Sequence, residues 1–131
     1  MVEAIPGTLR VLAERYAVCR LAAGATVDPS LFEREELAVL ARAPGELSLV
    51  CRESLRPPGA AAETGFRALG VVGPLDFSLV GVLAGLTGVL AQAGISVFAI
   101  STYDTDYLLV RETSLARALE ALRTAGYAVG E

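Results

Sequence analysis

Few side chains in this sequence could carry chemistry. Histidine is absent, so a Ser-His-Asp triad and any imidazole acid–base step are excluded. Cys19 and Cys51 lie in apolar stretches, which favours buried free thiols over a nucleophile or a disulfide. Asp104 and Asp106 could ligate a cation, but a turn that favours aspartate explains them more simply. We therefore expect no catalytic residue, no metal site and no cofactor, and predict that the protein is not an enzyme.

The best candidate site is the loop Gly73–Ser78, which runs from a predicted strand into a predicted helix. A helix N-terminus presents unpaired backbone N–H groups and the positive end of the helix dipole, which attract a carboxylate. Asp76, beside that terminus, could meet an ammonium group. A zwitterionic amino acid requires both features, whereas a plain N-capping role for Asp76 is an equally good explanation.

Three glycines, Gly81, Gly85 and Gly88, recur at helical spacing after this loop and would share one face of the helix. Each costs helix stability relative to alanine by about 1 kcal/mol, so a close approach of something to that face is indicated. Close packing within the fold is the favoured explanation, and a partner chain or a ligand is the alternative.

Composition and charge exclude several classes of protein. The chain has 131 residues, 53% of them hydrophobic, and a net charge of −4, and its basic residues are all arginines without a cluster. We expect no nucleic-acid binding from such a chain, and the arginine- and alanine-rich composition is typical of bacteria. Residues 78–100 carry no charge, but their period changes from helical to alternating at Gly94, so a buried helix followed by a strand is favoured over a membrane span. Without a recognisable leader, we expect the cytoplasm.

The second half has the clearer pattern. It predicts strands at 66–72, 95–102, 107–112 and 127–129, a helix from Phe77 or Ser78 to Gln92 capped by Asp76 or Ser78, and a second helix that begins at Thr113 or Ser114. The order βαββαβ is that of an α+β, ferredoxin-like unit with an antiparallel sheet and two helices on one face.

The first half predicts a shortened version of the same unit. Strands are expected at 9–13, 16–21, 37–41 and 46–51, a short helix at 29–36 and a linker around 57–59. VLARAPGELSLV (39–50) aligns with AISTYDTDYLLV (99–110) at an offset of 60, and both read as strand–turn–strand. We predict an abbreviated unit at 1–60 and a complete one at 61–131, packed as one body.

GPLDFSLVGVLAGLTGVLAQAGISVFAISTYDTDYLLV (73–110) closely resembles ACT domains in small bacterial proteins, with support from RYAVCRL (15–21) and ELSLVC (46–51). These proteins are similar to the regulatory domains of aspartate kinases and to the cytosolic arginine sensor of animal cells. The resemblance implies tandem ACT units in which an amino acid binds where the first loop meets the second strand of a neighbouring unit. Carried onto this sequence, the ligand-binding residues are Leu75, Asp76, Phe77, Ser78, Gly81, Ala99, Ile100, Ser101, Thr102, Tyr103 and Asp104.

Two functions remain open at this point. The first is a regulatory module that binds an amino acid at the loop of the second unit, as a homodimer and with an unidentified protein partner. The alternative is an interaction or oligomerisation module without a ligand, whose glycine face is the interface. Because the first unit lacks a long first helix, two equivalent sites per chain are doubtful.

Overall fold

The computed structural model describes residues 8–73, 75–76 and 78–130. The chain forms two compact units, a C-terminal unit of Met1–Ala13 with Arg67–Glu131 and an N-terminal unit of Glu14–Phe66. Strands β1 (Thr8–Leu21) and β4 (Ala61–Val71) each contribute residues to both units. We predicted two units that meet at residue 60. The compact units are instead divided at Ala13/Glu14 and Phe66/Arg67, so the boundary at residue 60 stays a prediction.

The C-terminal unit has the predicted order βαββαβ. After β4 come α2 (Val82–Gln92), β5 (Phe98–Ser101), β6 (Asp106–Arg111), the 3₁₀ turn η2 (Glu112–Ser114), α3 (Leu115–Thr124) and β7 (Ala128–Gly130). Its strands are ordered β7-β1-β4-β6-β5. β5 and β6 pair antiparallel, whereas β7 pairs with the start of β1 in parallel. The α+β ferredoxin-like class is thus confirmed, with β1 inserted beside β4.

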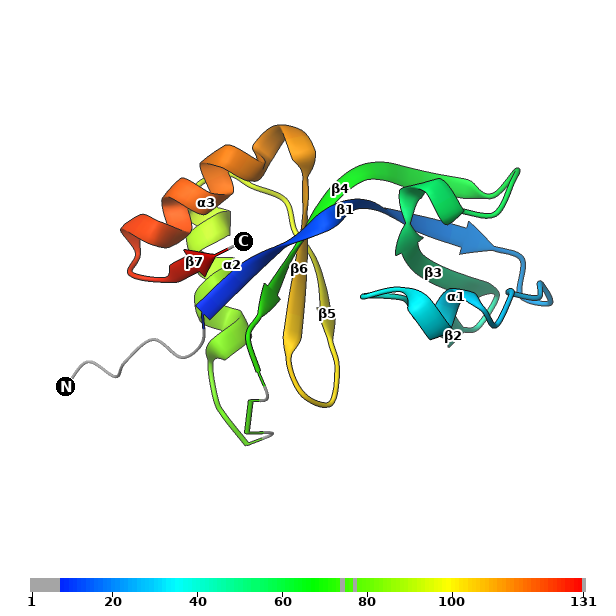
Figure 1. Cartoon of the computed structure of the whole chain (residues 1–131), viewed down its shortest axis with the longest axis horizontal. Coiled ribbons are helices and arrows are strands. Elements are labelled where there is room, and N and C mark those ends of the chain that lie inside the picture. The colour runs from blue at the N-terminus through cyan, green and yellow to red at the C-terminus, as the bar shows by residue number, and fades with distance from the viewer. Residues whose placement is uncertain (1–7, 74, 77, 131) are drawn as a thin grey trace. The chain divides into compact units, whose positions relative to one another are not determined.

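Helices α2 and α3 lie together on one face of this sheet (Figure 1). Their buried residues meet alternate residues of the strands in one apolar cluster, made of Leu9, Leu69, Val71, Leu86, Leu90, Ile95, Leu108, Val110, Ala118 and Leu122. The period of about 3.6 in the helices and 2 in the strands explains why these positions coincide.

Several element boundaries differ from those predicted, and the differences are largest for β1, β4 and α2. β1 is one strand of 14 residues rather than two, and β4 begins at Ala61, within what read as a linker. α2 begins at Val82 because Gly81 has a φ of 87°, a left-handed conformation that cannot belong to a right-handed helix. Neither Asp76 nor Ser78 therefore caps α2, and among the described residues no side chain does.

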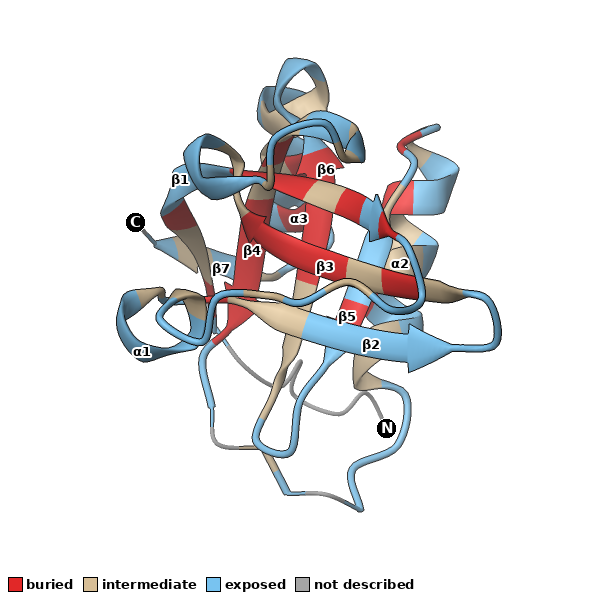
Figure 2. Ribbon diagram, turned by 90° about the vertical axis from the view of Figure 1, so that its right-hand side faces the viewer, coloured by how far each residue is buried: buried red, intermediate tan, exposed pale blue. Residues whose placement is uncertain are grey.

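The N-terminal unit repeats part of this arrangement. Its elements are the second half of β1, α1 (Leu31–Arg34), β2 (Val39–Ala43), β3 (Glu46–Arg52), the 3₁₀ turn η1 (Glu53–Leu55) and the first half of β4. The strand order β2-β3-β1-β4 matches β5-β6-β4-β1 of the C-terminal unit, and both hairpins occupy the segments that the sequence repeat aligned. β3 is buried along most of its length, whereas β2 is exposed (Figure 2).

Residues 78–100, which resembled a membrane span in composition, divide into α2 and β5. Within the described part of the chain, no helix has the length and apolarity needed to cross a bilayer. The division into a helix and a following strand is therefore confirmed. The expected burial is wrong, because only Leu86 and Leu90 of α2 are buried and β5 lies at the end of the strand order with mostly exposed residues.

Candidate functional site

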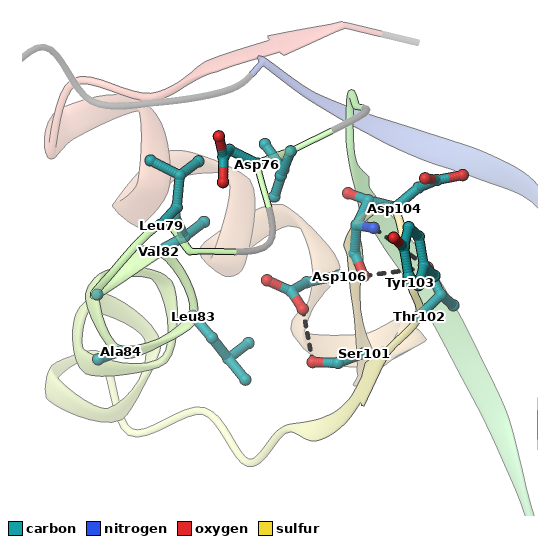
Figure 3. A pocket seen from close by; sticks show the side chains of 13 residues that line it. Asp76, Leu79, Val82, Leu83, Ala84, Ser101, Thr102, Tyr103, Asp104 and Asp106 are labelled. Atoms are coloured by element: carbon teal, nitrogen blue, oxygen red, sulfur yellow. Dashed lines mark hydrogen bonds between the residues drawn. The ribbon is translucent and has the colours of Figure 1, made fainter.

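A cavity of about 280 Å³ lies in the C-terminal unit where the loop after β4, the start of α2 and the β5–β6 turn meet (Figure 3). Seven of the eleven residues predicted for the site line it: Leu75, Asp76, Gly81, Ser101, Thr102, Tyr103 and Asp104. Six further lining residues were not predicted: Leu79, Val82, Leu83, Ala84, Thr105 and Asp106.

Asp76 organises the loop rather than the helix. Its Oδ1 accepts hydrogen bonds from the Ser78 hydroxyl at 2.7 Å and from the Ser78 backbone N–H at 2.9 Å. Its carbonyl accepts from the N–H of Leu79 at 3.0 Å, which closes a turn. The Ser78 hydroxyl and N–H lower the pKa of Asp76, because both donate to the charged form. An ionised carboxylate therefore stands at one wall of the cavity.

The first turn of α2 forms a second wall, next to Asp76. The Gly85 N–H bonds the Gly81 carbonyl at 2.9 Å and closes that turn, so the N–H groups of Val82, Leu83 and Ala84 precede the first intrahelical bonds. All three residues line the cavity, and no side chain caps the helix. This is the arrangement that attracts a carboxylate to a helix N-terminus.

The β5–β6 turn supplies the third wall. Ser101 donates through its hydroxyl to Asp106 Oδ1 at 2.5 Å, and Figure 3 shows the Asp106 carboxylate on the side of the hairpin that faces α2. The turn is closed by the Thr102 N–H, which donates to the Thr105 carbonyl at 2.8 Å. The Thr105 N–H donates in turn to Thr102 Oγ1 at 3.2 Å.

The loop and the hairpin turn are tied to each other. The Leu75 N–H donates to the Asp104 carbonyl at 2.7 Å, and the Thr105 hydroxyl donates to the Val71 carbonyl at 2.5 Å. Gly73 permits this approach, since a Cβ there would lie 3.0 Å from the Asp104 carbonyl oxygen. Two segments about 30 residues apart in sequence are thereby held as one site.

The remaining predicted residues lie elsewhere. Ser78 holds Asp76 without lining the cavity, and Phe77 is outside the described residues. Ile100 pairs with Tyr107 and projects to the other face of the sheet from Ser101, because side chains alternate along a strand. Ala99 shares the face of Ser101 but pairs deeper in the strand, with Leu108. Neither Ala99 nor Ile100 is among the residues that form the cavity wall.

The unpredicted lining residues have two origins. Leu79, Val82, Leu83 and Ala84 line the cavity because the helix begins four residues later than the sequence pattern indicated. Asp106 reaches it because its pairing with Ser101 puts both on the α2 face of the hairpin. The register of the hairpin, which the sequence pattern does not give, was the missing signal for Asp106.

The cavity has an uneven charge. Asp76, Asp104 and Asp106 line it, and no arginine does within the described residues. It can therefore hold a cationic group at these carboxylates and an anionic group at the N-terminus of α2. The volume of the cavity, about 280 Å³, is enough for one small zwitterion. Across the same part of the chain, histidine, cysteine, aspartate and glutamate form no group of three placed to hold a metal ion.

The two cysteines are buried and free. Burial raises the pKa of Cys19 and raises that of Cys51 to about 12. A thiol with such a pKa is almost wholly protonated at neutral pH, and the thiolate is the nucleophilic form. Their position supports the interpretation as core residues.

Comparison with known proteins identifies the fold. Residues 61–124 match the family model of the ACT domain. A solved protein from Agobacterium tumefaciens is 27% identical with a TM-score of 0.86, over 95% of this chain and 92% of that one. A Vibrio cholerae protein of unknown function, described as a possible transport protein, is 24% identical with a TM-score of 0.69, over 89% and 88%. No curated protein matches the chain.

A more distant likeness concerns the fold alone. The ligand-free regulatory subunit of aspartate kinase from Thermus thermophilus is 16% identical with a TM-score of 0.60. The match covers 86% of this chain and 93% of that subunit. The predicted similarity to aspartate kinase regulatory domains is thus confirmed at the level of structure.

Proposed function

We propose that the protein is a non-catalytic regulatory module that binds an amino acid in the cavity at the start of α2, because residues 61–124 match the model of the ACT domain, a family of regulatory domains. It would pass its signal to a separate protein. Two buried free thiols are in keeping with a cytoplasmic location, where cysteines stay reduced.

One observation carries this proposal. The cavity joins an uncapped helix N-terminus to three aspartates across a space of about 280 Å³. An α-carboxylate would accept from the N–H groups of α2, and an α-ammonium group would meet the aspartates. The apolar side chains of Leu79, Val82 and Leu83 would contact the remainder of the ligand.

The test is thermal unfolding of the protein in the presence of each of the twenty amino acids at millimolar concentration. A ligand at about 100 times its dissociation constant adds about 2.7 kcal/mol to the free energy of unfolding, which raises the melting temperature by several degrees. No shift with any of the twenty would contradict the proposal.

Two variants that each replace one aspartate by asparagine locate the site. Asp76→Asn keeps an acceptor for Ser78 but removes the charge, so we expect a smaller shift with the same ligand. Asp28→Asn in the N-terminal unit is the matched control. Asp28 Oδ1 accepts the Ser30 N–H at 3.0 Å, the same local contact that Asp76 makes with Ser78. Equal shifts in parent and Asp76→Asn would mean that the ligand binds elsewhere. Gly81→Val is unsuitable, since the φ of 87° strains any larger residue.

A homodimer or an interaction module is the second candidate. Leu79 and Tyr103, which line the cavity, are 48% and 82% exposed, and Val80, next to Leu79 in the sequence, is 94% exposed. Large exposed apolar side chains are typical of an interface when they form a patch. Light scattering across a concentration series would show a dimer that Val80→Ser weakens. A monomer at every concentration would contradict this candidate and leave the ligand site untouched.

A further inference from the structure

The N-terminal unit contains a second cavity, of about 650 Å³, with no counterpart in the site described above. It lies between the loop before α1, α1 itself, the end of β3 and the chain that follows η1. The repeat explains its origin. At the offset of 60, Leu55 corresponds to Leu115, the first residue of α3, but here Arg56-Pro57-Pro58 follows instead of a helix. Residues 55–58 line the cavity, and at the offset of 60 they correspond to the first turn of α3 in the C-terminal unit.

Arginines line this cavity, which we call the arginine cavity. Arg52 is matched, because its Nε lies 2.9 Å from Glu35 Oε1 and the Glu35 side chain is only 9% exposed. Arg56 donates from Nη1 to the Glu53 carbonyl at 3.1 Å, which leaves its charge without a carboxylate among the described residues. The Arg34 side chain has neither a hydrogen bond nor an ion pair to any residue the structure describes.

The acidic side chains of the cavity do not offset these charges. Glu35 is taken by Arg52. Asp28 adds one negative charge to the wall, and the N–H and hydroxyl of Ser30 lower its pKa by stabilising the charged form. With Arg34, Arg56 and Asp28 remaining, the cavity carries a net charge of +1 in a chain whose total is −4.

The rest of the wall is apolar. Val27 and Leu31 line the cavity and also pack on the buried cluster that contains Cys19 and Cys51. Leu55, Pro57 and Pro58 face it from the other side, and Leu55 is 41% exposed. An exposed leucine gains contact when an apolar group fills such a space.

We propose that the arginine cavity binds a small organic anion, whose apolar body lies against Leu31 and Leu55 and whose carboxylate, sulfonate or phosphate meets Arg34 and Arg56. Guanidinium groups form bidentate, charge-assisted hydrogen bonds with such groups. A cavity of this size accommodates a ligand of ordinary metabolite dimensions. The proposal concerns the N-terminal unit and is independent of the amino-acid site.

The experiment uses two fluorescent probes with similar apolar bodies. Anilinonaphthalene sulfonate carries one negative charge, and N-phenyl-1-naphthylamine carries none. We expect the sulfonate to bind the full chain with about tenfold higher affinity than the same chain with Arg34→Gln and Arg56→Gln, while the neutral probe binds both alike. Arg34→Lys with Arg56→Lys retains the charges and should recover part of the affinity.

Arg117→Gln and Arg123→Gln, on α3 of the other unit, form the matched control, and they should leave the affinity for the sulfonate unchanged. Circular dichroism checks that each variant is folded, which we expect because Arg34 and Arg56 are exposed. Failure of the sulfonate to bind the parent would overturn the proposal. So would an equal loss in the control variant, or an equal effect on both probes.

Discussion

The close contact between Gly85 and Tyr127 gives the sharpest stability prediction. A Cβ on Gly85 would lie 2.8 Å from Tyr127 Oη, whereas a Cβ on Gly88 would meet nothing within 4 Å. Both glycines are inside α2. The same substitution by alanine should therefore stabilise at Gly88 but not at Gly85.

The expected magnitudes follow from these distances. Gly88→Ala removes the backbone entropy cost of glycine in a helix and should stabilise by about 1 kcal/mol. With an unfolding entropy of about 2.1 cal/mol/K per residue over 131 residues, this raises the melting temperature by about 3–4 °C. Gly85→Ala has the same gain, but it must displace Tyr127, which packs against the main core cluster. Overpacking costs about 1–3 kcal/mol, so the net effect should be near zero or destabilising.

Chemical denaturation of a double-mutant cycle measures the contact directly. In a Tyr127→Phe background the hydroxyl is gone, so Gly85→Ala should recover the gain seen for Gly88→Ala. The coupling between the two sites should be at least about 1 kcal/mol, whereas Gly88→Ala should show none. If Gly85→Ala stabilises the parent as much as Gly88→Ala does, Tyr127 moves away without cost and the reasoning is refuted.

Two further predictions concern the pH dependence of stability and the hydrogen bond of Thr105. Burial raises the pKa of Tyr16 and of Cys51 to about 12, so the folded chain keeps protons that the unfolded chain loses from pH about 9 upward. The free energy of unfolding should fall by up to about 1.4 kcal/mol per pH unit for each group, between pH 9 and 12 for Cys51 and between pH 10 and 12 for Tyr16. Urea titrations above pH 10 should show a shallower fall for Tyr16→Phe, and an unchanged slope there would contradict the assignment. Thr105→Val removes the hydrogen bond to the Val71 carbonyl and should destabilise by about 1 kcal/mol, with no change expected for Thr113→Val at the 3₁₀ turn η2.

Much of the C-terminal unit was predictable from local pattern. The predicted strands at 95–102 and 107–112 and the predicted helix after Thr113 or Ser114 correspond to β5, β6 and α3. Gly94 ended the helix as expected, with a φ of 74°. These features are local, because the period of the apolar residues and the turn residues belong to one segment of chain.

The features that failed depend on distant partners. Pro57-Pro58-Gly59 and the alanine-rich residues after it read as a linker, yet β4 begins at Ala61 and pairs with β1. The pairing supplies the backbone hydrogen bonds, and the Gly65 N–H adds one to Glu53 Oε1 at 2.7 Å. In the same way, Leu79 and Val80 looked helical, but the left-handed Gly81 separates them from α2.

The difference between the two hairpin repeats bears on how many amino-acid sites one chain can have. The proposed site needs a helix long enough to present an uncapped, positively polarised N-terminus, and α2 has 11 residues. Its counterpart α1 has four residues, too few to build a comparable dipole or to leave N–H groups in a regular array. The carboxylates differ too, since Asp106 corresponds to Glu46, whose Oε1 accepts the Ser48 hydroxyl at 2.9 Å within its own strand. The shortened unit therefore cannot duplicate the site, and loss of its second helix left room for the arginine cavity.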